Sequence, residues 1–169
     1  PNCASNIVDC FGECDGSAQD LGCGCGEPAS EDLYDCDGNF VGANVQIIHN
    51  SASPTVDVYL DGALTIEGFE YRTATPVLTL PVSFSVGIAP AGGEVIADFP
   101  FELIEGGSYV VVATGLLGDT TTPFDLAAAG TTFGASSADV VGLEVYHGST
   151  DAPAVDIWAD DAPLLTDFS

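Results

Sequence analysis

Residues 45–62 read VQIIHNSASPTVDVYLDG, and residues 143–161 repeat the pattern as LEVYHGSTDAPAVDIWADD. A repeat of this kind marks a structural unit that buries its apolar face against its neighbours. In the first copy, Val45, Ile47 and His49 recur at every second position, which is the period of a β-strand. With a one-residue insertion, the aligned pairs are His49 with His147, Ser51 with Ser149, Pro54 with Pro153, Asp57 with Asp156 and Tyr59 with Trp158.

The whole chain from residue 43 onward consists of short runs rich in Val, Ile, Thr, Tyr and Phe, which β-sheets favour. Gly, Pro and Asp separate the runs and favour turns. Many short strands at regular spacing predict an all-β fold, an Ig-like β-sandwich over residues 43–138, and no stretch predicts a helix. The expected strands are 45–49, 56–60, 77–80, 84–89, 95–104, 108–114, 124–127, 140–147 and 154–159.

The second copy occupies residues 139–169 and is the start of a second repeat. Two strands alone are at best marginally stable in water, so these strands require a partner. Two interpretations remain open: the natural protein continues with the rest of a second module, or the strands are donated to the sheet of another molecule. The apolar residues expected at this interface are Val141, Leu143, Val145, Val155, Ile157 and Trp158.

Charge excludes two classes of partner. The chain has 26 Asp and Glu against a single basic residue, Arg72, for a net charge of −25. Nucleic acid and anionic membrane surfaces both require clustered Lys and Arg, so neither is an expected partner. The 46% hydrophobic content is too high for a disordered acidic tail. Since the sequence has no Met, we expect either an internal fragment or a chain whose initiator and any secretory signal have been removed.

All six cysteines lie within the first 36 residues, in a segment of Gly- and Asp-rich turns. An even number of cysteines in a short segment predicts a disulfide framework and an oxidising, extracellular or cell-surface location. Zinc is the alternative, although the spacings differ from the paired C-x2-C of common structural sites. The connectivity stays open among Cys3, Cys10, Cys14, Cys23, Cys25 and Cys36.

Residues 1–42 also concentrate acids on these turns, with no basic residue before Arg72. Calcium binds carboxylate, amide and backbone oxygens on sharply turning loops, so calcium is the expected cofactor. The alternative is that these acids are solvated turn residues. The candidate ligands are Asp9, Glu13, Asp15, Asp20, Asp35, Asp37 and Asn39.

We expect no enzymatic activity. His147, Ser149 and Asp151 lie too close in sequence on a strand end for the geometry of a catalytic triad, and no nucleophile-elbow motif surrounds Ser149. The repeated Asp57 and Asp156 are better explained as strand-end side chains that bond a loop amide. The sequence has no Asn-x-Ser/Thr sequon, so any glycan would be O-linked, and the place to look is the threonine run at residues 120–122.

The segments IIHNSASPTVDVYLDG (47–62) and LIEGGSYVVVATG (103–115) resemble a family of β-sandwich modules of unknown function, found in tandem in secreted and surface proteins of bacteria and archaea. That family typically opens with V-R-V-x-H-x-S-P-D-A-P-x-V-D-V-Y, which residues 147–157 match more closely than the first copy does. The N-terminal segment is similar to the calcium-binding aspartate repeats of thrombospondins, although it departs from the strict D-x-D-x-D-G pattern.

Together, these resemblances imply an extracellular structural module that has no active site. We expect a structural subunit of an extracellular filament or surface layer that assembles with copies of itself by strand addition. The alternative is a binding module of a tandem-repeat cell-surface adhesin.

Overall fold

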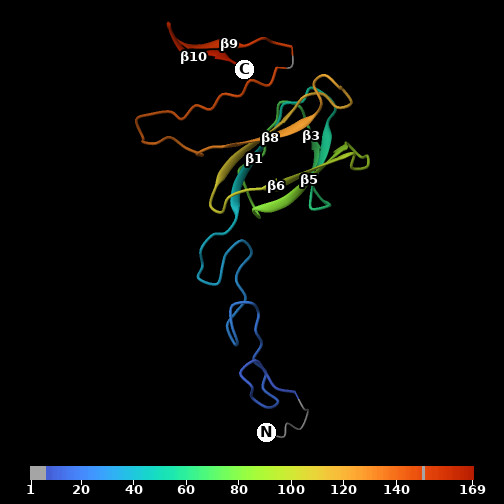
Figure 1. The fold of residues 1–169 in the computed structure, drawn as a ribbon, viewed down its shortest axis with the longest axis vertical. Helices are drawn as coiled ribbons and strands as arrows, with labels where there is room; N and C mark the ends of the chain where they lie inside the picture. Colours follow the sequence, from blue (N-terminus) through green and yellow to red (C-terminus); the bar gives the residue numbers. More distant parts are fainter. Residues whose placement is uncertain (1–6, 150) are drawn as a thin grey trace.

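The computed structural model describes residues 7–149 and 151–169. Eight strands form a β-sandwich, a ninth and a tenth form a separate hairpin, and the described residues contain no helix (Figure 1). The strands are β1 (Ala43–His49), β2 (Val56–Leu60), β3 (Ala63–Phe69), β4 (Leu78–Leu80), β5 (Ser83–Pro90), β6 (Ala97–Glu102), β7 (Ser108–Thr114), β8 (Asp125–Gly130), β9 (Val155–Ala159) and β10 (Ala162–Phe168).

The sandwich has two four-stranded sheets, ordered β4-β1-β7-β8 and β3-β2-β5-β6. All neighbouring strands are antiparallel except β1 and β7, which run parallel from Asn44↔Ser108 to His49↔Ala113. The predicted all-β class with a disulfide-rich N-terminal segment is confirmed. Eight strands divide here four and four, whereas a constant-type immunoglobulin domain divides seven strands four and three.

The core lies between the two sheets and is built from the alternation seen in the sequence. In β1 the buried residues are Ala43, Val45 and Ile47, and the residues between them are half-buried. Strands β2 and β5 add Val58 and Ile88 from the facing sheet. Because every second residue of a strand points to the same face, this pattern fixes which face of each sheet is buried.

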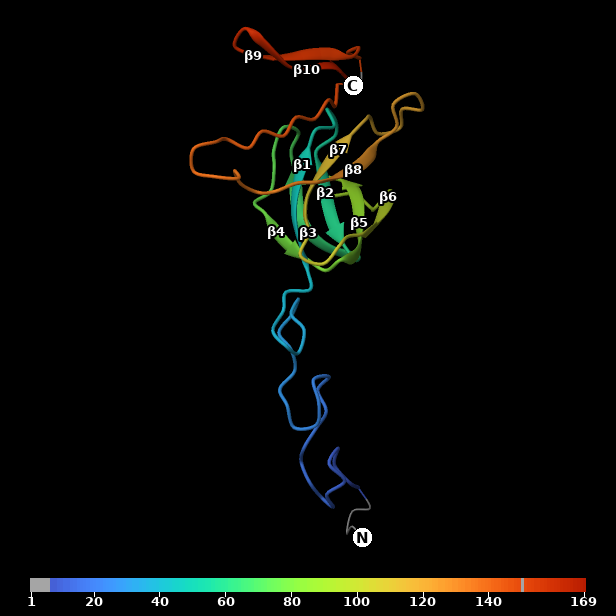
Figure 2. The same cartoon turned by 60° about the vertical axis from the view of Figure 1, so that its left-hand side comes forward.

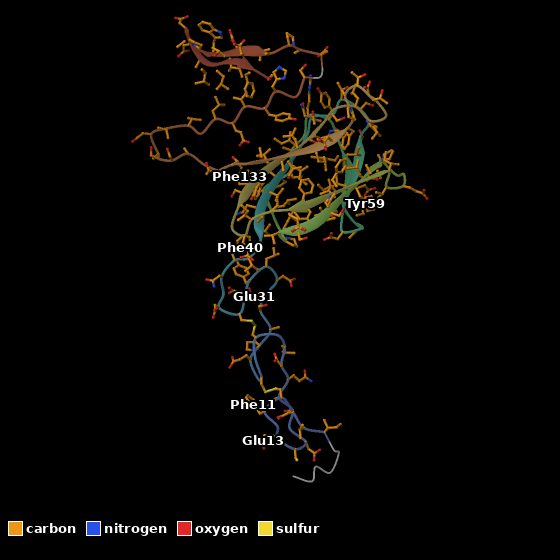
Figure 3. All side chains as sticks on the ribbon, viewed as in Figure 1. Phe11, Glu13, Glu31, Phe40, Tyr59 and Phe133 are labelled. Carbon is orange, nitrogen blue, oxygen red and sulfur yellow. A yellow bond between two sulfur atoms is a disulfide. The ribbon has the colours of Figure 1, made fainter. Side chains whose placement is uncertain are left out.

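Residues 7–42, called the N-terminal stalk below, extend away from the sandwich as a narrow segment (Figure 1). Three short turns follow one another, closed by the isolated bridges Val8↔Cys14, Asp20↔Cys25 and Tyr34↔Phe40. Phe40 lies where the stalk meets the sandwich, and Phe11, Glu13 and Glu31 are spaced along the stalk (Figure 3).

The predicted disulfides are present in the stalk. Cys10 bonds Cys25, and Cys23 bonds Cys36. Cys14 is disulfide-bonded as well, and the described residues contain no free cysteine. These bonds exclude a zinc site built on these thiols. Cys3 lies outside the described residues.

Residues 139–169 are called the C-terminal repeat below, and their hairpin β9–β10 stands beyond the sandwich (Figures 1 and 2). Among the described strands, β9 and β10 pair only with each other. The predicted strand at 140–147 is wrong: these residues have no regular secondary structure, because no neighbouring strand offers them a ladder. Strands β3 and β10 were not predicted. The described part of the chain contains no helix long and apolar enough to cross a lipid bilayer.

Candidate functional site: the C-terminal repeat and the open sheet edges

The C-terminal repeat reproduces two side-chain interactions of the sandwich. His49 Nε2 lies 3.2 Å from the carbonyl oxygen of Pro54, and His147 Nε2 lies 3.2 Å from that of Pro153. In each copy the imidazole N–H donates to the carbonyl and ties the end of the first segment to the start of the next strand. The sequence repeat is therefore also a repeat of local structure.

The second shared interaction is a carboxylate that bonds a backbone N–H eleven residues later. Asp57 Oδ1 accepts from Gly68 N at 2.7 Å, and Asp156 Oδ1 accepts from Asp167 N at 2.9 Å. Both contacts close a hairpin, β2–β3 in the sandwich and β9–β10 in the repeat. The sequence predicted loop amides as partners, but Gly68 lies within β3 and Asp167 within β10; the loop partner of Asp57 is Gly92.

The sandwich completes this polar cluster with two further contacts. Asp57 Oδ2 accepts from Gly92 N at 2.7 Å, and these N–H donors lower the pKa of Asp57, that of Gly68 most. Ser51 Oγ donates to the carbonyl of Gly115 at 2.9 Å, and Ser51 is only 1% exposed. The contacts come from the loops after β5 and β7, so the cluster depends on strands of both sheets.

The C-terminal repeat lacks these two contacts. Ser149 Oγ donates instead to its near neighbour Asp151, at 2.9 Å, and is exposed. Among the described residues, Asp156 accepts one backbone N–H, that of Asp167. No described strand stands beside β9 where β5 stands beside β2. The repeat therefore has the first hairpin of a sandwich without the strands that complete it.

Histidine burial shows the same difference between the two copies. His49 is fully buried against Phe69, with ring centroids 5.5 Å apart, and its Nδ1 has no hydrogen-bond partner among the described residues. Burial lowers the pKa of His49. His147 is half-buried and faces Phe168 at 6.3 Å. His147 and Ser149 each bond elsewhere, so the structure does not assemble them into a nucleophile–base pair.

The predicted interface residues are largely accessible. Val141 is 91% exposed, Leu143 69% and Trp158 57%. Val145, Val155 and Ile157 are half-buried. A contiguous exposed apolar patch is uncommon on a protein surface unless it forms a contact, although single exposed apolar residues are ordinary.

An open groove of about 1510 Å³ lies on the outer face of the sheet β4-β1-β7-β8. Its floor consists mostly of small and β-branched side chains from three adjacent strands, and residues 131–135 and 140–146 form its wall. Phe133, in this wall, and Tyr59, on the other sheet, lie on opposite sides of the sandwich (Figure 3). The residues of the floor are Gln46, Ile48, Val110, Val112, Ala127 and Ala129.

Three of the predicted calcium ligands of the stalk accept hydrogen bonds from backbone N–H groups of their own turns. Asp9 Oδ1 accepts from the N–H groups of Phe11 and Glu13, at 3.1 and 2.9 Å. Asp35 Oδ1 accepts from those of Asp37 and Asn39, at 2.9 and 2.8 Å. Each aspartate thus closes its own turn through the amides two and four residues later, which is the geometry of an Asx turn.

The third turn follows the same rule. Asp20 Oδ1 accepts from Gly22 and Gly24, at 2.9 and 3.2 Å. The described residues contain no group of three or more His, Cys, Asp or Glu placed to hold a metal. Calcium binding by the acids listed above stays a prediction. At Asp35, the side-chain amide of Asn39 and then its backbone N–H lower the pKa.

The family of this chain follows from comparison with known protein families. A family described as a domain of unknown function, DUF4397, matches residues 43–158. The chain belongs to this family. The match begins where β1 begins and continues through the sandwich into β9, so it includes both copies of the sequence pattern. No curated protein matches the chain.

Sequence reasoning missed one element of the site. It expected the strand at 124–127 and left Ala128, Ala129 and Gly130 out, because small residues carry little strand preference. The structure continues β8 through Gly130. The available signal was the run of uncharged small residues after Asp125, which suits an edge strand that can pack closely against another backbone.

Proposed function

We propose that the protein is a structural subunit of an extracellular filament or surface layer. In this proposal the C-terminal repeat joins one subunit to the next by adding its strands to a sheet of a neighbouring copy. One observation carries the proposal: the repeat reproduces the first hairpin of the sandwich, yet the described residues supply none of the strands that complete that hairpin in the sandwich.

Strand addition suits the chemistry of this segment. Backbone hydrogen bonds to an open sheet edge provide affinity, and alternate side chains provide specificity. Val155, Ile157 and Trp158 would supply those side chains, because they leave apolar surface uncovered in the single chain. A contact between different surfaces of two copies extends into a filament when the rotation between them does not close a ring.

The stalk supports an extracellular setting. Its disulfides persist in oxidising compartments and give order to a segment that has little apolar core of its own. The net charge of −25 keeps isolated chains apart. Assembly by this highly acidic protein would therefore depend on salt or divalent cations in the medium. We propose no catalytic activity.

A second candidate function is a module of a tandem-repeat cell-surface adhesin. One observation favours it: the pattern of residues 45–62 recurs at residues 143–161, as it would in a chain of consecutive modules. In that case the completing strands come from the same polypeptide as the hairpin.

Electron microscopy and sedimentation of the full chain test the proposal. Wild-type protein should form regular fibres or sheets, and Ile157→Asp should abolish them because a charge would enter the strand-addition contact. Ile96→Asp is the matched control, since Ile96 is 54% exposed, lies between β5 and β6 and is not among the residues that line the groove described above. A wild-type chain that stays monomeric at high concentration, with the β9 amides protected from hydrogen exchange, would contradict the proposal.

A further inference from the structure

The four edge strands of the sandwich differ in how well they are protected against pairing. Natural sheets block their edges with proline, charge, bulges or short strands. Strand β6 contains Pro100 together with two acids, and β4 has only three residues, between Pro76 and Pro81. Strand β3 has register irregularities opposite β2.

Strand β8 has none of these features. It pairs with β7 residue by residue from Thr114↔Asp125 to Tyr109↔Gly130 without a bulge. Its single charge, Asp125, lies at its first position, and Leu-Ala-Ala-Ala-Gly follows. Residues 128–130 are exposed. Among the four edge strands of the sandwich, β8 is therefore the one whose backbone is open to pairing with another strand.

The direction of the free amides on β8 follows from the ladder. Thr131 N donates to the carbonyl oxygen of Ser108. Hydrogen-bonded positions alternate along an antiparallel pair, so the backbone N–H groups of residues 129 and 127 also donate to β7. The N–H groups of Ala128 and Gly130 therefore point away from β7. Leu126 N agrees with this phase, since it donates to the carboxylate of Asp125 instead of to β7.

The hairpin β9–β10 has an open edge of its own. In the sandwich, Ala91 N donates to Thr55 O and Asp61 N donates to Ser85 O, so Thr55 and Asp61 are hydrogen-bonded positions of the β2–β5 ladder. Bonded positions alternate along a strand, so the backbone groups of Tyr59, which lies between them, also face β5. Trp158 is the counterpart of Tyr59 in the repeat. Trp158 lies opposite Pro163 in β10, and proline has no N–H to offer, so the backbone of Trp158 also faces away from its partner strand.

We propose that the open edge of β8 in one copy of this chain receives β9 from a second copy. The sheet β4-β1-β7-β8 would then continue into the neighbour's β9 and β10. This inference rests on the proposed function and names its acceptor. The strand that binds β8 comes from a second copy, because the two unprotected edges, β8 and β9, belong to different elements of the same chain. Their lengths, six and five residues, are similar.

Two further features suit this pairing. The groove described above adjoins β8, and Ala127 and Ala129 form part of its floor, so side chains of an added strand would meet small residues there, although Phe133, Glu144 and Tyr146 also line the groove. The donor surface and the acceptor surface are different, so each subunit keeps one free donor and one free acceptor after pairing. Such a contact propagates from copy to copy.

The test uses proline variants of the full chain, because proline removes the N–H that an added strand must bond. Ala128→Pro and Gly130→Pro block the acceptor edge while leaving the β7–β8 ladder its donors. Trp158→Pro blocks the donor edge. Ala138→Pro, in the exposed turn after β8 and outside the lining of the groove, is the matched control. Far-UV circular dichroism and thermal melting first establish that each variant is folded.

Sedimentation and electron microscopy then give distinct outcomes. If the inference holds, either acceptor variant raises the concentration needed for assembly by about tenfold or more, from the loss of one or two backbone hydrogen bonds. Ala138→Pro assembles like wild type. A mixture of Ala128→Pro with Trp158→Pro gives dimers, because each variant keeps the half that the other lacks.

Two results would overturn the inference, and they separate it from the proposed function. If both acceptor variants assemble normally while Trp158→Pro stays monomeric, donation is correct and β8 is not the acceptor. If Trp158→Pro also assembles normally, or if the wild type never assembles, strand donation itself is wrong. If Ala128→Pro does not fold, Gly130→Pro alone tests the acceptor edge, because Gly130 is the last residue of β8.

Discussion

Replacing Ser51 by alanine tests whether the polar cluster of the sandwich depends on strands from both sheets. Ser51 Oγ donates to the Gly115 carbonyl at 2.9 Å, and both residues are buried. Alanine removes the donor and leaves a buried carbonyl without its partner. A net hydrogen bond contributes about 1 kcal/mol, and an unsatisfied buried group costs about 1–3 kcal/mol, so we expect a loss of about 1–3 kcal/mol.

The repeat supplies the matched control, because Ser149→Ala changes the aligned serine, which is exposed and donates to its near neighbour Asp151. Its effect should stay within about 0.5 kcal/mol. Urea unfolding monitored by circular dichroism gives the free energy of unfolding of both variants. For a domain of this size, the melting temperature of Ser51→Ala should fall by roughly 5–20 °C. Equal effects of the two substitutions, or an unchanged Ser51→Ala melt, would refute the reasoning.

Four other predictions follow from the structure. Stability should fall as the pH drops below 6.5, because burial lowers the pKa of His49 in the folded chain, so the unfolded chain binds the proton first. It should fall again as the pH drops below 3.8, because the backbone N–H groups of Gly68 and Gly92 lower the pKa of Asp57 in the folded chain; Asp57→Asn should flatten that part of a urea-unfolding series. Reduction with a phosphine should speed hydrogen exchange in the stalk and leave the sandwich melt unchanged, since no cysteine lies beyond residue 36; a sandwich that melts lower would contradict this. Calorimetric titration of calcium into chelator-treated protein should give heat and raise the melting temperature, with Asp35→Asn weakening both, whereas a flat titration would leave the turn-closing role alone. Light scattering should show assembly increasing with ionic strength, because salt screens the net charge of −25; no dependence on salt would argue against contacts between like-charged subunits.

The sequence predicted the sandwich well where alternation and turns agree. Residues 108–114 form β7 with the predicted bounds, and 45–49 and 56–60 lie within β1 and β2. Periodicity fails at β3, where Ala63–Phe69 has mostly exposed residues and so carries no apolar face to detect. It fails in the opposite sense at 140–147, where the alternation is clear but the structure offers no partner strand.

The candidate site was predictable in part for a physical reason. The repeat identified Asp57 and Asp156 as equivalent, and a local hydrogen bond to a hairpin amide depends only on nearby sequence. The contacts of Ser51 with Gly115 and of Asp57 with Gly92 join residues 64 and 35 positions apart. Such contacts depend on sheet topology, and a single sequence carries no direct signal for it.

The two disulfides of the stalk have a mechanical consequence. Fully stretched, the chain from Cys10 to Cys36 would reach roughly 90 Å. The two bonded loops overlap, however, so a pull along the stalk passes from Cys10 to Cys25, back through Gly24 to Cys23, and across to Cys36. With Cα separations of 5.5 and 5.3 Å across the bonds, that covalent path is only about 18 Å long. The stalk is therefore a tether of nearly fixed length, in which a tensile load bypasses most of the turns and leaves them folded.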